Sequence, residues 1–522
     1  MKIYGMFGVE PEIQAYAMAR YSRSALSMAE SINELTAEQA ENFLNTFYFE
    51  YGHRSIADMA HLALALEDIS ILSAMRVVDE QLWDGQERST RYQVFKSGSY
   101  VVPKEIQEHQ DIHENFVQVC DSLFENYETI TNGLVDILSE YYKRPDGLSN
   151  GAYRRSLRAR AFDISRGLLP VATKTSVGQV VSARVLENQI TRLLSDDIEE
   201  VRAIGNEMRE ACTRPASNPM SDELLSLFTQ ENLVSLPPDV QESVTKLLDR
   251  VVSANLSPTL VKYAEKRSYP TAMLQQFESI ANTLMGKQRV NQTQSVEYAK
   301  HETPEEEIIA TLLYRTGVGG HSYSQIQDVV AQIPKDEMSR LLALAWEDRG
   351  PHDEIPRELH SGYQVKFDLL LDIGAYRDLH RHRRCTQIAQ GLTANHGYVD
   401  AETTFLQGLE NDELVRKARK EGLLSLYEGA LDKAGSFVDS ISSQVPHSAP
   451  YALPLAYRTR ALFKMDAAEA AYIIELRTKE GGHFSYRHIA WEMLNVLKQQ
   501  MPTFSQNVRA TDPNVPVDIF QR

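Results

Sequence analysis

The sequence predicts an α+β fold in which each of two similar halves forms a twisted, mainly antiparallel sheet with helices packed on it. Three observations support this. Strand-like runs occur in both halves, and the clearest, YQVKFDLLLDIGAY at 363–376, alternates and then turns apolar. Helical spacing of apolar residues fills other stretches, such as 105–145. The order of these patterns also recurs along the chain, which indicates a tandem duplication with diverged copies.

The first repeat is expected at residues 1–212. A short apolar segment and a helix-like pattern fill residues 1–30, and Thr36 is positioned to cap a second helix at 37–51. A turn with His53 and Ser55 then leads into a strand-like run, and helical patterns return from about 176 to 212. Residues 213–290 contain TRPASNPMS and SLPPD but keep recurring apolar residues, so we expect an ordered helical connector.

The second repeat is expected at residues 291–522. VEYAKHETPEEEIIATLLYRTG at 296–317 has the layout of MFGVEPEIQAYAMARYSRS at 6–24. PHSAPYALPLAYRTRALF at 446–463 likewise parallels DISRGLLPVATKTSVGQ at 163–179, with a Leu-Pro after a small-residue turn in each. These parallels run in the same order through both halves.

Composition excludes several classes of protein. The chain has 522 residues, 43% hydrophobic and 24% charged, as in ordinary globular proteins. Its net charge of −18 argues against binding to nucleic acid or to an anionic membrane, but a local basic pocket for a small phosphorylated ligand is compatible with it. The 3 cysteines lack the spacing of a disulfide framework or a metal site, and no apolar signal or membrane segment is present. We therefore expect a cytoplasmic protein without a bound metal.

A basic cluster interrupts this acidic chain at Arg377 and at His380–Arg384, directly after the strand-like run at 363–376. Because desolvated charge is costly, a cluster at the end of a buried element must be paired or bind an anion. The alternative is a solvated helix face with alternating charge. Cys385 adjoins the cluster, and a catalytic role for its thiol is the less favoured interpretation.

Two pieces of this sequence together resemble the signature of the flavin-dependent thymidylate synthases, Arg-His-Arg followed by Glu-x-Ser-x-Arg-Tyr. The second half has the opening, Arg381-His382-Arg383, but Ala389–Ala394 (AQGLTA) where the close should fall. The first half has the close, Glu87–Tyr92 (ERSTRY), but Asp79-Glu80-Gln81 where the opening should fall. Each half has lost what the other keeps.

Other family motifs divide in a similar way. The family's His-x-Ser resembles His53-Arg54-Ser55, with Asp58 in place of Glu, and its Arg-x-x-Leu-Pro resembles Arg166–Pro170. The family's Asn-x-Arg resembles Ser182-Ala183-Arg184, with Asn188 one helical turn later. The pyrimidine-contacting Leu-Arg resembles Leu476-Arg477, and the first-half alternative, Arg192, requires a gap. The sequence departs from the family at Ser182, and at Asp378 where the family has Gln.

The resemblance implies an FAD enzyme that converts dUMP, or a related pyrimidine nucleotide, to dTMP with methylenetetrahydrofolate and NAD(P)H. It implies the thymidylate-synthase-complementing type of fold in each half. Because family sites lie between the subunits of a homotetramer, it also implies a homodimer that forms a pseudo-tetramer, with one composite site built from the two repeats. The alternative is a non-catalytic or repurposed paralogue that binds flavin or pyrimidine nucleotide.

The resemblance also implies roles for single residues. The cofactor set is His53, Ser55, Glu87, Arg184, Asn188, Arg381, His382 and Arg383. The substrate set is Ser89, Arg91, Arg166, Arg381 and Arg477, of which Arg477 is the catalytic residue because it would stabilise charge on the pyrimidine ring. A purely structural role stays open for four of the motif residues. Tyr92 could be a core residue, His53 a core histidine, Ser55 a helix cap, and Arg184 part of an interface salt bridge.

Overall fold

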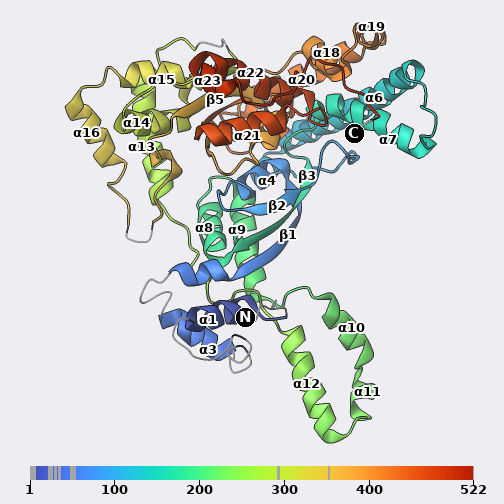
Figure 1. Ribbon diagram of the computed structural model, residues 1–522, viewed down its shortest axis with the longest axis vertical. Helices are drawn as coiled ribbons and strands as arrows, with labels where there is room; N and C mark the ends of the chain where they lie inside the picture. The colour runs from blue at the N-terminus through green and yellow to red at the C-terminus, as the bar shows by residue number, and fades with distance from the viewer. Residues whose placement is uncertain are drawn as a thin grey trace. The chain divides into compact units, whose positions relative to one another are not determined.

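The computed structural model describes residues 8–21, 28, 32, 37–46, 54–290, 294–350 and 353–520, and every structural statement below concerns these residues. The elements follow Figure 1. Thr36, predicted to cap a helix, and His53, predicted to bind the cofactor, lie outside the described residues.

The first half and the connector contain the following elements. The first half has α1 (Pro11–Tyr21), α3 (Ala37–Leu44), η2 (Arg54–Met59), β1 (His61–Ser70), α4 (Ile71–Val77), β2 (Asp84–Glu87), α5 (Lys104–Gln107), α6 (Gln110–Tyr141), α7 (Asn150–Ser165), η3 (Arg166–Leu168), β3 (Lys174–Ser182), α8 (Ala183–Leu194) and α9 (Glu199–Thr213). The connector has α10 (Pro219–Leu227), α11 (Gln230–Val234), α12 (Pro238–Val252) and α13 (Tyr269–Met285). Helices therefore occupy much of residues 213–290, and their role as a connector between two repeats stays a prediction.

The second half repeats much of this element order. It has β4 (Val296–Tyr298), α14 (Pro304–Arg315), η4 (Val318–Gly320), α15 (Tyr323–Val330), α16 (Lys335–Leu344), η5 (Arg357–Leu359), β5 (Val365–Asp372), α17 (Ile373–Leu379), β6 (Thr386–Ala389), α18 (Ala401–Leu409), α19 (Asp412–Lys420), α20 (Leu423–Ile441), η6 (Ala449–Ala452), β7 (Arg458–Met465), α21 (Ala467–Arg477), α22 (Phe484–Gln500) and α23 (Pro502–Ser505). In both halves a 3₁₀ turn is followed by a strand and a short helix, η2-β1-α4 and η5-β5-α17, and a later 3₁₀ turn leads into a strand and two helices. The duplication itself stays a prediction.

The contacts divide the chain into two compact units. Unit 1 comprises Met1–Leu66, Leu82–Gln86 and Val177–Arg267, and unit 2 comprises Glu67–Gln81, Glu87–Ser176 and Ser268–Arg522. The three strands of the first half form one sheet in the order β1-β3-β2. The expected boundaries at 212/213 and 290/291 stay a prediction.

One expectation for the first half is wrong. The helical pattern assigned from about residue 176 begins only at Ala183, because Lys174–Ser182 is strand β3. Val177, Gln179 and Val181 are buried between more exposed neighbours, and this period of two is that of a strand with one covered face.

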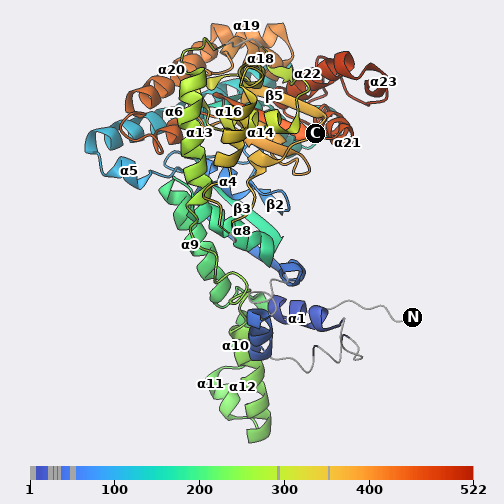
Figure 2. The same ribbon diagram turned by 90° about the vertical axis from the view of Figure 1, so that its left-hand side faces the viewer.

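Unit 2 contains the antiparallel sheet β4-β5-β7-β6. All eight residues of β5 are buried, as expected for a central strand covered on both faces, and the register pairs Val365 with Met465 and Asp372 with Arg458. Helices α14 and α22 pack against this sheet, as Figures 1 and 2 show. Helix α14 starts with a capping box between Thr303 and Glu306. The α+β class and the strand before the basic cluster are thus confirmed.

Candidate functional site

The two Leu-Pro turns, one from each half, pair with each other inside unit 2. Pro170 and Pro454 form an antiparallel bridge. Leu455 N donates to Leu169 O, and Val171 N donates to Leu453 O, each at 2.9 Å. This pairing brings η3 of the first half to the start of α17 in the second half, where a Cβ on Gly374 would lie 3.4 Å from Arg166 Nη2.

A small cavity forms at this junction. Its lining residues are Arg88, Ser89, Thr90, Arg91, Arg166, Gly374, Arg377, Asp378 and Arg381. Four of the predicted substrate residues therefore line the same cavity. Ser89, Arg91 and Arg166 come from the first half, and Arg381 comes from the second. The cavity holds about 20 Å³, roughly the room of one water molecule.

Arg91 is held rigidly in this cavity. The residue is 8% exposed, and its Nε and Nη2 donate to the two carboxylate oxygens of Asp163 at 2.7 and 3.3 Å. Burial by itself would lower the pKa of Arg91, but Asp163 outweighs it and raises the pKa above its usual value. Ser89 Oγ accepts from the backbone N of Arg91 at 3.2 Å, which fixes the turn. Because both oxygens of one carboxylate hold the guanidinium, the orientation of its remaining N–H groups is fixed.

Arg166 bridges the two halves through Asp378. Its Nη2 donates to Asp378 Oδ2 at 3.2 Å, and its Nη1 donates to Thr90 Oγ1 at 3.4 Å. Burial tends to raise the pKa of Asp378, but Arg166, Arg381 and Arg91 lower it to about 2. Asp378 is therefore ionised at neutral pH, and it neutralises part of the cavity's positive charge.

Arg377 adds a donor that the sequence reasoning left without a role. Arg377 pairs with Glu87, and its buried Nε has no hydrogen-bond partner among the residues the structure describes. Arg88 also lines the cavity. The sequence signals were available, since Arg377 belongs to the basic cluster and Arg88 to the Glu-x-Ser motif. Glu87, which the resemblance assigns to cofactor binding, forms an ion pair with Arg377 in this structure.

The donor set of the cavity fits an oxoanion. Arg88, Arg91, Arg166, Arg377 and Arg381 meet the carboxylates of Asp163, Glu87 and Asp378, which leaves an excess of positive charge. Arginine forks match the geometry of phosphate oxygens. The cavity thus fits the phosphate of a nucleotide or of FAD, whereas its lining provides no aromatic or apolar wall for a flavin ring.

A second group surrounds His382. Arg477 Nε donates to His382 Nε2 at 2.7 Å, so the ring proton is assigned to Nδ1, which faces Glu469 Oε1 at 3.7 Å. Burial, above all, lowers the pKa of His382, and the Arg477 charge lowers it further. The Arg477 guanidinium also lies over the ring of Tyr486 at 5.4 Å. A neutral His382 therefore orients Arg477, which is half-buried and retains further N–H groups.

The other residues of the basic cluster differ in exposure. Arg381 is exposed, and Arg383 is half-buried and donates to Arg381 O at 3.0 Å. Burial raises the pKa of the Cys385 thiol to about 12, and its Sγ donates to His382 O. Cys385 is therefore a protonated structural thiol at neutral pH. Tyr92 is 58% exposed, so its interpretation as a core residue is wrong.

Three predicted cofactor residues belong to unit 1. Arg184 pairs with Asp58 at 3.2 Å, and both side chains are substantially exposed. Ser55 is exposed in η2, and Asn188 is half-buried in α8. Ser182 caps α8 by accepting from Val185 N at 3.4 Å. The salt bridge of Arg184 thus lies within the chain.

The sequence reasoning missed a buried histidine behind Arg91. His483 Nε2 donates to Asp163 O at 2.7 Å, and His483 Nδ1 accepts from Ser485 N at 3.2 Å. Burial and the nearby Arg166 lower the pKa of His483 well below its usual range. Ser485 in turn donates to Asp372, the cap of α17. No motif marked His483, because its importance depends on tertiary contact with Asp163.

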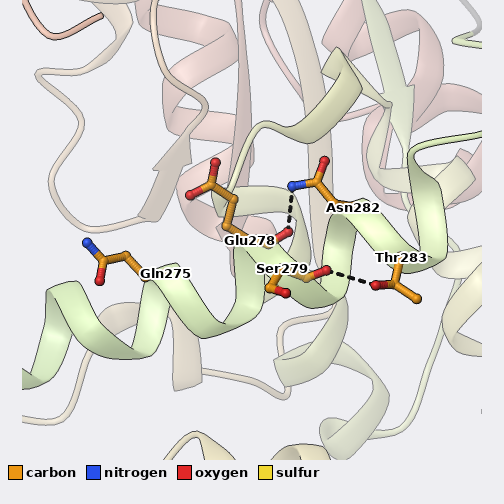
Figure 3. Close-up of a pocket in the computed structure, with 5 residues that line it drawn as sticks. All are labelled: Gln275, Glu278, Ser279, Asn282 and Thr283. Atoms are coloured by element: carbon orange, nitrogen blue, oxygen red, sulfur yellow. Dashed lines mark hydrogen bonds between the residues drawn. The ribbon is translucent and has the colours of Figure 1, made fainter.

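A second hollow, on the surface along α13, is not a candidate site. Figure 3 shows five polar side chains along one helix, α13, beside a hollow of about 500 Å³. Two of these side chains form hydrogen bonds to the backbone of the same helix: Asn282 donates to Glu278 O and Thr283 donates to Ser279 O, each at 3.0 Å. Over the described ranges, no group of three potential ligands is placed to hold a metal ion, and no helix is long and apolar enough to cross a membrane.

Comparisons with known proteins identify several relatives of this chain. A UPF0159 protein of Chlamydia muridarum is 26% identical over 92% of this chain and 82% of its own length. Another, from Thermoplasma acidophilum, is 23% identical over 95% of this chain and 94% of its own. A flavin-dependent thymidylate synthase of Clostridium tetani is 23% identical over 40% of this chain and 80% of its own.

Among solved structures, a flavin-dependent thymidylate synthase of Helicobacter pylori, complexed with FAD and dUMP, covers 42% of this chain at 14% identity. Its TM-score of 0.27 is too low to relate the two folds. The sequence profile of the thymidylate synthase complementing proteins matches residues 8–216 and 359–503, which is more than half of the chain. The chain therefore belongs to the thymidylate synthase complementing protein family.

Proposed function

We propose that this protein is a flavin-dependent thymidylate synthase that methylates dUMP to dTMP with methylenetetrahydrofolate and NAD(P)H. The observation that carries the proposal is the cavity in which arginines of both halves meet. The family membership and the named relative from Clostridium tetani support the same reaction. The site is composite, because the first half supplies Ser89, Arg91 and Arg166 and the second supplies Arg381.

Arg91 and Arg166 bind the nucleotide phosphate in this proposal. Each guanidinium has five N–H groups, and the carboxylates of Asp163 and Asp378 engage only part of them. The remaining donors meet the phosphate oxygens, with Ser89 beside them. Because the cavity has room for about one water molecule, Asp378 and the arginine side chains must move apart when the phosphate enters.

Arg381 and Arg383 hold the phosphates of FAD, and the bound flavin supplies the hydride chemistry. Ser55, Arg184 and Asn188 remain proposed flavin contacts on unit 1, together with His53. We propose that they contribute to the site through a homodimer with a pseudo-tetrameric arrangement of repeats. The second half lacks the closing motif and the first lacks the opening, so the reciprocal site binds no flavin.

Arg477 acts on the pyrimidine ring. Its Nε is fixed by His382 at 2.7 Å, and its other N–H groups can meet two ring acceptors. As negative charge develops on the ring, these preorganised donors stabilise it and make C5 nucleophilic. A neutral His382 is suited to this positioning because it accepts from Arg477 and adds no competing charge.

The second candidate function is a non-catalytic or repurposed paralogue. Asp378 favours it, since an ionised carboxylate 3.2 Å from Arg166 occupies the place a phosphate oxygen would take. Such a protein would bind flavin or nucleotide weakly and would not turn over.

Flavin content and titration test the proposal. The purified protein, or apoprotein titrated with FAD, should show flavin absorbance with a limit of one FAD per chain. Tritium release from C5 of labelled dUMP should then depend on methylenetetrahydrofolate and a reductant. A protein that stays colourless and inactive after reconstitution supports the paralogue, and two equivalent FAD sites per chain contradict the split site.

A further inference from the structure

Asp378 places a negative charge in the wall of the cavity that Arg91 and Arg166 line. Its Oδ2 accepts from Arg166 Nη2 at 3.2 Å. Burial tends to raise the pKa of Asp378, but three arginines lower it to about 2, so the carboxylate is ionised at neutral pH. Among the residues that the structure describes, its other oxygen, Oδ1, accepts no hydrogen bond. Asp378 therefore offers an open acceptor to a ligand that enters the cavity.

The helix that carries Asp378, α17, is anchored at both of its ends. At its start, Asp372 caps the first turn by accepting from Ala375 N at 2.8 Å. Directly after its last residue, His380 Nε2 lies 3.0 Å from Asp79 Oδ1. The backbone at Asp378 is thus held in place, and rotation of the side chain can widen the cavity without removing the carboxylate from its wall.

The buried charges of the cavity are balanced before a ligand enters. Three buried arginines form ion pairs with three carboxylates: Arg91 with Asp163, Arg166 with Asp378 and Arg377 with Glu87. The two other arginines of the lining, Arg88 and Arg381, are exposed, so solvent and salt screen their charges. A doubly charged phosphate would therefore meet an ionised carboxylate without a further buried cation to offset it.

The surroundings of Asp378 supply no additional cation. The charged and titratable groups that face it from the packed elements are Arg91, Arg166, Asp372, Arg381 and His483. The arginines among them are those already counted. Burial and Arg166 lower the pKa of His483 well below its usual range, so this histidine is neutral at pH 7. Like charges at such short range disfavour full ionisation of the ligand.

We propose that Asp378 makes this cavity accept the nucleotide phosphate in its singly charged form, whose O–H donates a hydrogen bond to Asp378 Oδ1. The other phosphate oxygens then meet Arg91 and Arg166. Asp378 thereby determines which ionisation state of dUMP binds, and this role rests on the proposed function of the site. It belongs to this chain in particular, because the family has Gln at this position, and a Gln side chain is uncharged.

The affinity for dUMP should therefore fall as pH rises. A phosphate monoester loses its second proton with a pKa of about 6, and the charge of Asp378 raises this pKa in the complex. Binding is tightest below about pH 6, where free dUMP already carries the proton, and it weakens about tenfold for each pH unit above.

Two substitutions of Asp378 remove the charge. Asp378→Asn keeps an oxygen for Arg166, and Asp378→Gln restores the residue of the family. Both variants should bind the doubly charged form, so their affinity should be nearly independent of pH and should exceed that of wild type about tenfold or more at about pH 8. This gain depends on the Arg166 fork and is absent when Arg166 is replaced by alanine.

Isothermal titration of the FAD-loaded, full-length protein with dUMP at about pH 6, 7 and 8 measures this dependence. At about pH 8, titration in buffers of different ionisation enthalpy should count about one proton taken up per dUMP in wild type and about none in the variants. Deoxyuridine 5′-sulfate, which has one charge and no titratable proton, is the control ligand and should bind equally at each pH. The control variant Glu402→Gln, at an exposed ion pair with Arg419, should keep the wild-type dependence.

Proton uptake and a pH-dependent affinity that both disappear in Asp378→Asn and Asp378→Gln support this role. Turnover of dUMP without proton uptake by wild type, or an equal pH dependence in wild type and both variants, overturns the role and leaves the proposed function intact. If wild type binds no dUMP at any pH, the proposed function falls together with it. Circular dichroism checks the fold of each variant, and the wild-type proton count requires no variant.

Discussion

Asp79 of the first half accepts a hydrogen bond from Arg357 of the second half, with Oδ1 and Nη1 2.5 Å apart. Arg357 Nη2 also donates to Asp79 O at 2.7 Å, and His380 Nε2 lies 3.0 Å from Asp79 Oδ1. Asp79 stands where the family signature would have its first arginine. Asp79, at the position of the opening motif that the first half lacks, thus binds basic residues of the second half. It anchors His380, the residue before Arg381.

Removing this anchor should cost both stability and cofactor affinity. Asp79→Ala removes the carboxylate that faces both Arg357 and His380, although the main-chain acceptor for Arg357 remains, so we expect the free energy of unfolding to fall by about 1–3 kcal/mol. FAD affinity should fall with it because Arg381 follows His380 directly. Urea unfolding and FAD titration measure the two effects. The control is Asp328→Ala, which breaks an exposed pair with Lys300 and should cost less than about 1 kcal/mol.

Arg166→Ala should weaken dUMP binding by about 1.5–3 kcal/mol, the range for hydrogen bonds to charged groups. FAD affinity should change less, since Arg381 and Arg383 remain. Equilibrium titrations of both ligands check this. The double variant Arg166→Ala, Asp378→Asn also removes the carboxylate left unpaired, and it should recover stability without recovering dUMP affinity. Loss of flavin with unchanged nucleotide binding would contradict the assignment.

Arg477→Lys tests the proposed role on the pyrimidine. Lysine keeps the charge but loses the planar fork and the Nε bond to His382, so turnover should fall about 10²-fold. Binding of dUMP should fall much less, because Arg91 and Arg166 hold the phosphate. The measurements are dUMP-dependent oxidation of reduced flavin and direct dUMP titration. If turnover is unaffected, this residue has no such role, and Arg192 becomes the next candidate.

His396 should make the protein sensitive to mild acid. Its pKa is about 4 in the folded chain and about 6.5 in an unfolded one, so the unfolded chain takes up the proton first as pH falls. Its contribution to stability is present above about pH 6.5 and is lost towards pH 4, by about 3 kcal/mol. Urea unfolding in amine–chloride buffers should show a weaker pH dependence for His396→Asn than for wild type. Exposed His447→Asn should behave as wild type; equal slopes in all three proteins would exclude this role.

Local sequence was sufficient to predict those elements whose residue pattern does not depend on contacts with distant parts of the chain. The alternating and then apolar run before the basic cluster predicted β5, because burial of a strand dictates its own residue types. The start of α14 is also encoded locally, by Pro304 and the capping box between Thr303 and Glu306. The error at residues 176–182 arose where a half-covered strand, with its period of two, runs directly into the amphipathic helix α8.

The sequence by itself indicated two halves with complementary motif losses and predicted that their arginines form an anion site. Only the tertiary structure decided how these side chains are paired. Pairing of the Leu-Pro turns brings Arg166 to Asp378, and burial places Asp163 and His483 behind Arg91. Residues distant in sequence meet through packing, and hydrogen-bond partners depend on angstrom-scale geometry that no spacing along a chain encodes.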